Sequence, residues 1–186
     1  MFTRVLGPSA VFGPLEPWHA GQLAANVERG RAYLAPWVPL ATRIVDEDSA
    51  RAWMVDYAQR QAQDTGRSYG IWLDATLVGG TVFRVFDTAA GWCEIGVWLE
   101  PAAQGRGLVS AAVRLMVGWA LGERGLYRVE WRTDPANARS RAVAVRLGMH
   151  LDGVLRGAYE VAGVRRDTEV WSLLATEWPG TAAGTG

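Results

Sequence analysis

The 186-residue chain has one cysteine, two histidines and no lysine, and each scarcity excludes a class of site. A single thiol, Cys93, allows neither an intramolecular disulfide nor a cysteine-based metal cage. Because the residues around Cys93 are typical of a strand, we expect a buried structural thiol and not a nucleophile. His19 and His150 lack the spacing of metal ligands, so we expect no metal site.

Long apolar runs are also missing. Pro8, Gly13, Pro14 and Pro17 interrupt the N-terminal segment, which therefore lacks the apolar stretch of a signal peptide. No segment approaches the ~20 consecutive apolar residues that a membrane-spanning helix requires. We therefore expect a cytoplasmic protein that has no membrane partner.

Neither sign of charge is in excess. Nineteen acidic residues balance nineteen arginines, so no strong field attracts the chain to nucleic acid, and we expect no nucleic-acid partner. Apolar residues are plentiful: 49% of the chain is hydrophobic, which is enough for one core at this length. We expect a single domain over residues 1–178 and a loose tail of small and breaker residues over 179–186.

Hydrophobic periodicity predicts helices embedded in a sheet. Alternating and β-branched segments predict strands at 11–15, 69–73, 77–86, 92–99, 128–133, 151–155 and 168–174. Recurrence at steps of three and four predicts helices at 19–29, from 46 or 48 to about 64, at 108–123 and at 139–147. The apolar, proline-broken stretch 33–39 predicts an irregular loop. One strand–helix–strand crossover over 92–133 gives a mixed α/β layout that is mostly antiparallel.

The segment 94–108 carries the most chemical information. A strand leads into a loop with Gly105 and Gly107, and the most regular amphipathic helix of the chain begins at Leu108. Glycines let the backbone come close to a ligand, and the first turn of a helix has unpaired N–H groups and a partial positive charge. With Arg106 as an extra countercharge, these features predict a pyrophosphate cradle.

Two common nucleotide-binding motifs do not fit this loop. A Walker loop requires Gly-Lys-Ser/Thr, and the chain has no lysine. The dinucleotide fingerprint requires a third glycine three residues after Gly107, where Ser110 stands. A glycine pair before a helix also occurs as a plain turn, so the loop alone leaves its role open.

Several motifs in order resemble the GNAT acetyltransferases, in the branch of the ribosomal-protein N-acetyltransferases RimJ and RimL. The loop 104–107 resembles the family's Q/R-x-x-G-x-G/A acetyl-CoA motif, and 93–99 is similar to the EIGYWL strand of that branch. Residues 137–140 with 146–149 resemble its N-x-x-S … K/R-x-G-F element. Further matches at 151–156, 163–167 and 171–174 extend the resemblance over about residues 81–178.

The resemblance implies a fold and a cosubstrate site. It implies a sheet of about seven strands, flanked by about four helices, in which a bulged strand 94–99 splays from strand 128–133 to admit the pantetheine of acetyl-CoA. Backbone groups are then expected to hold pantetheine at Val97, Trp98 and Leu99. Backbone N–H groups are expected to hold the pyrophosphate at Gln104, Gly105, Arg106, Gly107, Leu108 and Val109. Asn137 is expected to contact the cofactor arm, and Ser140 to lie near the sulfur.

Catalytic roles follow from the same resemblance. Ser140 is placed to donate a proton to the departing thiolate, although it is equally a first-turn helix residue. Glu94 is the first candidate for the general base, with pairing to an arginine as its structural alternative. Glu160 is the second candidate. The family's glutamate aligns with Tyr159, one residue earlier, and a shift by one residue changes the face of a strand.

The acceptor end of the site is expected at Tyr33, Trp37 and Tyr159, where this family shapes its cleft. We therefore expect an N-acetyltransferase that transfers acetyl from acetyl-CoA directly to a primary amine, such as the α-amine of a protein N-terminus or peptide. Two alternatives stay open: a small-molecule amine such as an antibiotic as the acceptor, and a non-catalytic acyl-CoA sensor. Homodimerisation is common in this branch.

Overall fold

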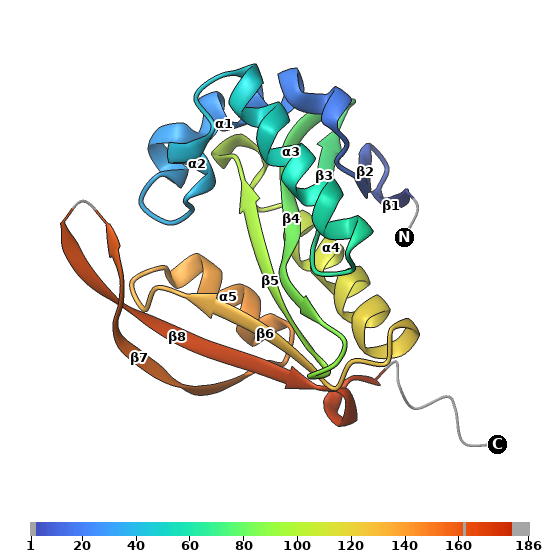
Figure 1. Cartoon of the computed structure of the whole chain (residues 1–186), viewed down its shortest axis with the longest axis vertical. Helices are drawn as coiled ribbons and strands as arrows, with labels where there is room; N and C mark the ends of the chain where they lie inside the picture. Colours follow the sequence, from blue (N-terminus) through green and yellow to red (C-terminus); the bar gives the residue numbers. More distant parts are fainter. Residues whose placement is uncertain (1–2, 162, 180–186) are drawn as a thin grey trace.

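The computed structural model describes residues 3–161 and 163–179, and an eight-stranded sheet is its framework. The strand order is β1-β2-β3-β4-β5-β6-β8-β7, with β5 and β6 parallel and the other neighbours antiparallel. The strands in Figure 1 are β1 (Arg4–Gly7), β2 (Ala10–Pro14), β3 (Arg67–Leu73), β4 (Thr76–Asp87), β5 (Trp92–Leu99), β6 (Arg128–Thr133), β7 (His150–Val161) and β8 (Val164–Leu174). The expected mixed, mostly antiparallel sheet is confirmed, with the N-terminal β1 as an additional strand.

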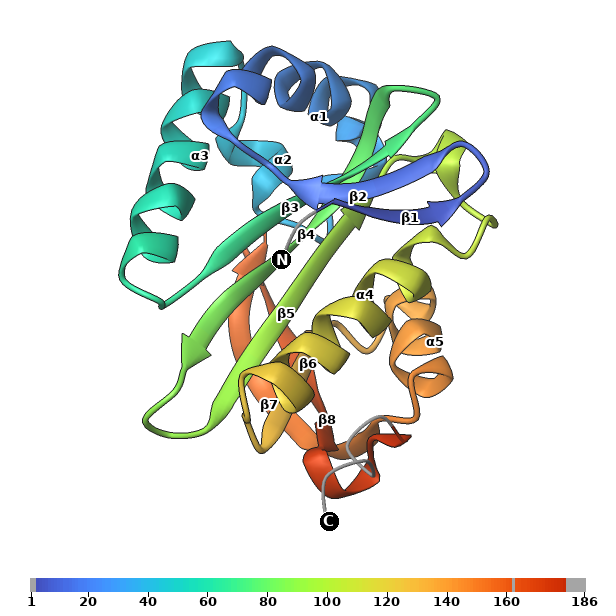
Figure 2. The same cartoon turned by 90° about the vertical axis from the view of Figure 1, so that its right-hand side faces the viewer.

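Helices cover both faces of the sheet. One face carries α1 (Ala20–Leu34), α2 (Leu40–Arg43) and α3 (Glu47–Ala62), whose buried residues form one core cluster with Trp98. The other carries α4 (Leu108–Gly118) and α5 (Ala138–Arg146), which lie side by side in Figure 2 and pack on Ile95 and Trp131. Since side chains alternate along a strand, Glu94 and Gly96 of β5 share the α1–α3 face with Trp98.

The sheet splays between β5 and β6. Their pairing ends at Ile95 and Trp131, while β5 continues along β4 to Leu99 and β6 continues along β8 to Thr133. In Figure 1 the two strands begin side by side and then separate. The expected splay is confirmed, but the bulge lies elsewhere. The extra residue is Arg84 of β4, because Phe83 and Val85 pair with consecutive residues of β5.

Two expected boundaries are wrong for reasons of packing. α1 does not end at Gly30 but continues to Leu34. A Cβ at Gly30 would lie 2.9 Å from Cδ1 of Leu34 and 3.6 Å from Cβ of Glu100, so this glycine permits close packing and is not a cap. The expected loop 33–39 therefore begins after α1, and the short helix α2 follows it. The hairpin β7–β8 is also longer than its apolar segments indicated.

The cap of α3 and the burial of Cys93 agree with the expectations. The helix after Asp46 is capped by that residue, whose carboxylate accepts from the backbone N–H of Ser49. Cys93 is buried, and burial raises the pKa of its thiol far above the usual range, with the charges of Glu130 and Glu94 adding to the effect. Within the described residues no helix combines the length and the apolarity needed to cross a bilayer. Residues 180–186 of the expected tail lie outside the described part of the chain.

Candidate active site

A cleft of about 1250 Å³ opens where the sheet splays. Pockets for one small ligand usually have ~300–1,000 Å³, so this cleft has room for more than one small molecule. Its walls come from both faces of the sheet. The predicted site residues that line it are Tyr33, Trp37, Glu94, Val97, Trp98, Leu99, Gln104, Gly105, Arg106, Gly107, Leu108, Val109, Asn137, Ser140 and Tyr159. Glu160 is not among the lining residues.

One end of the cleft is the loop before α4. Gly105 and Gly107 have φ of 77° and 72°, a conformation that favours glycine, and a Cβ at either would meet no atom within 4 Å. The first bond of α4 runs from the N–H of Ala111 to the carbonyl of Gly107, at 3.0 Å. The amides of 108–110 therefore have no partner within the helix, and no side chain of the described residues caps it. This open, glycine-lined helix start fits a pyrophosphate.

The edge of β5 forms the middle of the cleft. Beyond Ile95 the backbone of β5 on the side of β6 has no strand partner, and Gly96 to Leu99 line the cleft there. An extended chain with amide groups can pair with such an edge as an additional strand would. The pantetheine arm of coenzyme A is a chain of this kind.

The N-terminus of α5 places a hydroxyl beside this edge. Asn137 caps the helix, since its Oδ1 accepts from the backbone N–H of Ser140 at 3.1 Å. Oγ of Ser140 accepts from Nε1 of Trp131 at 3.0 Å. Because an indole N–H only donates, the hydroxyl proton of Ser140 is left for an acceptor in the cleft. The sequence analysis did not single out Trp131, because its place in the last β5–β6 pair is visible only in the structure.

The comparisons with known proteins identify the family. The chain matches the family model of the acetyltransferase (GNAT) domain over residues 11–150. The chain belongs to the GNAT acetyltransferase family. It is 30% identical over 181 residues to the putative ribosomal N-acetyltransferase YdaF of Bacillus subtilis (strain 168), an alignment that covers 97% of this chain and 99% of YdaF.

Solved structures agree with this assignment. The crystal structure of a probable acetyltransferase matches with a TM-score of 0.88 and 30% identity, covering 96% of this chain and 99% of the other. RimL, the ribosomal L7/L12 alpha-N-protein acetyltransferase in complex with coenzyme A, shares the fold with a TM-score of 0.85 at 19% identity, covering 91% and 96%. As a GNAT member the protein is an acyltransferase, and acetyl-CoA is the acetyl donor of the family.

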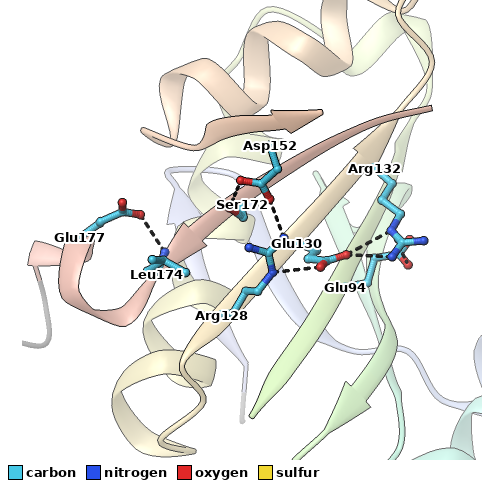
Figure 3. Close-up of polar contacts among 8 residues, drawn as sticks. All are labelled: Glu94, Arg128, Glu130, Arg132, Asp152, Ser172, Leu174 and Glu177. Atoms are coloured by element: carbon cyan, nitrogen blue, oxygen red, sulfur yellow. Dashed lines mark hydrogen bonds and ion pairs between the residues drawn. The ribbon is translucent and has the colours of Figure 1, made fainter. Parts of the chain in front are cut away.

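On the α1–α3 face of the GNAT sheet, the carboxylate of Glu94 lies in the cleft wall. Its side chain is 8% exposed and lies between two guanidinium groups: Oε1 is 3.2 Å from Nη1 of Arg84 and Oε2 is 3.8 Å from Nε of Arg132. Figure 3 shows Arg132 shared with Glu130, at 3.0 Å, in a chain of ion pairs that continues through Arg128 and away from the cleft. Glu94 therefore lines the cleft and has the arginine partners of its structural alternative, while its role as general base stays a prediction.

Side chains alternate along β7, and this alternation separates Tyr159 from Glu160, the two candidates for the position of the family's glutamate. Tyr159 points into the cleft, and its hydroxyl donates to Oδ2 of Asp134 at 2.7 Å. Burial raises the pKa of Tyr159 to about 12, and the hydrogen bond and charge of Asp134 add to this. Glu160 is exposed and forms an ion pair with Arg165 at 3.6 Å. The structure therefore does not bring Glu160 to the other site residues, because the next side chain of a strand faces the opposite side.

The wall opposite the phosphate loop is aromatic. Trp53 of α3 packs on Tyr57, with ring centroids 4.5 Å apart, and meets Trp98 edge to face at 5.9 Å. Tyr33 lies at the end of α1, where its hydroxyl accepts from Nη1 of Arg139 at 3.0 Å. That bond joins α1 to α5 across the cleft. The sequence analysis did not single out Trp53 or Tyr57 as residues of the site.

The charges in the wall are mainly positive. Two carboxylates, Glu94 and Asp134, line the cleft, and each lies within 4 Å of an arginine. Six arginines line it: Arg43, Arg84, Arg106, Arg132, Arg139 and Arg146. Arg84 and Arg132 flank Glu94, whereas Arg43 and Arg139 lie on the α2 and α5 walls. An anionic or neutral ligand suits this wall better than a polycation does.

Proposed function

We propose that this GNAT enzyme transfers the acetyl group of acetyl-CoA to the α-amine of a protein N-terminus or peptide. The observation that carries the proposal is the course of the cleft. It runs from the glycine loop before α4, through the splay beside Ser140, to the aromatic wall on the opposite face of the sheet. Two substrates can therefore enter from opposite faces and meet at the splay.

The cosubstrate acetyl-CoA is held along the glycine loop, the free edge of β5 and the first turn of α5. Bound acetyl-CoA supplies an acyl group that is activated as a thioester. The amides of 108–110 and the guanidinium of Arg106 hold its pyrophosphate, and the free edge of β5 over 96–99 pairs with its pantetheine arm. Asn137 keeps the first turn of α5 beside that arm by capping the helix.

Two side chains handle protons at the splay. Glu94 lies on the acceptor face, and its carboxylate accepts a proton from the ammonium group of the acceptor, directly or through water. Ser140 lies on the opposite face, and its free hydroxyl proton is available to the departing thiolate, which becomes the thiol of coenzyme A. Trp131 holds Oγ of Ser140 in place for this role.

The charge of the acceptor wall favours a peptide over a polycationic drug. Arg43 and Arg139 line the cleft and pair with no carboxylate of the described residues. They repel an aminoglycoside or a polyamine and attract acidic side chains that follow a peptide's N-terminal residue. YdaF is described as a putative ribosomal N-acetyltransferase, which supports the same class of acceptor. The half-buried rings of Tyr33 and Trp53 offer contact area to the first side chains of a peptide.

The test is a thiol-release assay with acetyl-CoA against paired peptides. Each pair has the same first residue and either acidic or basic residues at the next three positions, and an N-terminally blocked copy is the matched control. We expect release with free N-termini, faster with the acidic peptide, and none with the blocked copy. Mass spectrometry locates the acetyl group on the α-amine.

Other outcomes decide against the proposal. Release only with an amine-bearing antibiotic or a polyamine would make the protein a small-molecule acetyltransferase. Tight acetyl-CoA binding in calorimetry, without release from any amine in the panel, would favour an acyl-CoA sensor.

A further inference from the structure

Behind the aromatic wall lies a buried polar network centred on Asn26 of α1. The side chain of Asn26 is fully buried, and both of its polar atoms are bonded to residues at the end of β5. Oδ1 accepts from Nε1 of Trp98 at 2.9 Å, and Nδ2 donates to Oε2 of Glu100 at 2.9 Å. A buried amide is costly unless it is hydrogen-bonded, so a core packed only for stability would favour an apolar residue here.

The partners of Asn26 belong to two parts of the active site. Trp98 lines the cleft, whereas Glu100 opens the segment that leads from β5 to Gln104 and the glycine loop. Glu100 is 6% exposed and also accepts from Nε of Arg29 at 2.9 Å. One amide therefore connects the acceptor wall with the start of the phosphate loop.

The orientation of the Trp98 indole is restricted by ring packing and by one hydrogen bond. Its benzo ring lies over Gly80 of β4, where a Cβ would come within 2.4 Å of Cη2. It also meets Trp53 at an interplanar angle of 88°, within the core cluster of the α1–α3 face. Packing fixes where the ring lies, and the bond from Nε1 to Asn26 fixes which way its edge points.

We propose that Asn26 is a positioning residue of the acetyltransferase. It orients Trp98 as part of the acceptor wall and, through Glu100, ties that wall to the loop that holds the pyrophosphate. A leucine of similar size would fill the same space but would not direct the indole edge, because dispersion contacts are not directional. The inference requires only the acetyltransfer reaction of the family and not a particular amine.

The variants exchange hydrogen-bonding roles and keep the volume. Asn26→Asp keeps an acceptor for Trp98 but places a carboxylate against Glu100. Oε2 of Glu100 accepts from both Asn26 and Arg29. In Asn26→Asp/Glu100→Gln an amide nitrogen takes the place of that oxygen and donates to the carboxylate now at position 26. The double variant therefore restores the bond between positions 26 and 100 and the charge of the network, while Arg29 keeps its bond to the carbonyl of Leu77. Asn26→Leu removes both bonds.

Steady-state kinetics use the amine that turns over fastest in the panel. We expect Asn26→Asp and Asn26→Leu to raise the acceptor KM about 10-fold, since small displacements of a positioning group can cost up to ~100-fold. The Kd of acetyl-CoA from calorimetry should rise about 3-fold, because the loop is coupled less directly. The double variant should return the acceptor KM and the Kd of acetyl-CoA to within about 3-fold of the parent values.

A second readout works without any acceptor. The indole N–H of Trp98, identified in an NMR spectrum by its loss in Trp98→Phe, should exchange slowly with solvent in the parent and in the double variant. It should exchange faster in Asn26→Leu.

Two results would overturn the proposal. An unchanged acceptor KM in Asn26→Leu, with a lower Tm, would reduce the network to core packing. If no amine in the panel is acetylated, the peptide proposal fails separately; unchanged indole exchange and unchanged acetyl-CoA affinity in Asn26→Leu would then overturn the role of Asn26.

Discussion

The indole N–H of Trp131 donates to Oγ of Ser140 at 3.0 Å and thereby places a hydroxyl at the last residue pair before the sheet splays. The bond uses one lone pair of the oxygen and leaves its proton free. A residue that the sequence marks only as buried and aromatic thus orients the proposed proton donor.

Replacing Ser140 by alanine should lower kcat about 10-fold or more, since a positioned acid typically contributes ~10²–10⁴-fold. The Kd of acetyl-CoA should change less than 3-fold, because the backbone N–H of residue 140 still donates to Oδ1 of Asn137 and the helix cap is kept. Trp131→Phe removes only the orienting bond and should give a smaller loss of kcat. Stopped-flow thiol release and calorimetry measure the two quantities. A normal kcat in Ser140→Ala would leave the residue as part of the helix start.

Replacing Glu94 by glutamine should lower kcat/KM about 100-fold if its carboxylate accepts the proton of the acceptor. Glu130→Gln is the matched control, because Glu130 shares Arg132 but does not line the cleft. The control should lower the Tm and leave kcat/KM within about 3-fold. Equal losses of activity in the two variants would make Glu94 a structural partner of the arginines.

Replacing Gly107 by tryptophan should weaken acetyl-CoA binding at least about 30-fold, because a side chain there covers the amides that hold the pyrophosphate. Gly125→Trp is the control: its φ of 66° is similarly strained, a Cβ there also meets no atom within 4 Å, and it does not line the cleft. Both variants should lose a similar amount of stability, about 1 kcal/mol. If calorimetry gave comparable acetyl-CoA Kd values for Gly107→Trp and Gly125→Trp, the assignment of the loop as the pyrophosphate site would be contradicted.

Replacing Tyr159 by phenylalanine should raise the acceptor KM several-fold and leave the pH profile unchanged. Burial and the hydrogen bond to Asp134 raise the pKa of Tyr159 to about 12, so its hydroxyl stays protonated between pH 6 and 9. It can therefore donate to Asp134 or to a ligand but cannot serve as a base in this range. A change in the basic limb of kcat/KM between pH 6 and 9 would contradict this role.

Replacing Asp64 by asparagine tests a contact outside the site. Hydrogen bonds from Arg124, and then from Arg67, lower the pKa of Asp64 to about 2. Because the folded-state pKa is lower than the unfolded value of 3.8, the pair stabilises the protein above about pH 4, and this contribution is lost as pH falls toward 2. Asparagine tolerates the φ of 59° at this position.

Urea unfolding at pH 7 should show a loss of about 1 kcal/mol in Asp64→Asn, reduced by solvent screening because the side chain is 37% exposed. The difference from the parent should shrink at pH 3. Asp56→Asn, which removes an exposed pair with Arg60, should cost less than about 0.5 kcal/mol. A deficit in Asp64→Asn that persists undiminished at pH 3 would argue against the charge effect.

Local chemistry made part of the site readable from the sequence. Gly107 has a left-handed φ of 72° and precedes a regular apolar helical repeat, so the turn and the helix start could be predicted together. Gly30 is also a glycine but lies inside α1, where Glu100, 70 residues later in the segment after β5, packs against it. A glycine therefore predicts a turn or a helix end only where the residues that decide its role are its neighbours in the sequence.

The amino-acid sequence by itself determined the strands, the long helices, the glycine loop and the resemblance to the GNAT family, because each depends on residues close together in the chain. Only the tertiary structure decided which side chains meet in the cleft. Asn26 and Trp98 are 72 residues apart, and Tyr33 and Arg139 are 106 apart, yet each pair shares a hydrogen bond. No periodicity encodes such pairs, since they form only when helices dock on opposite faces of a splayed sheet. Likewise, the pairing of β7 with β8 decided which face of β7 lines the cleft, so that Tyr159 faces the cleft and Glu160 faces solvent.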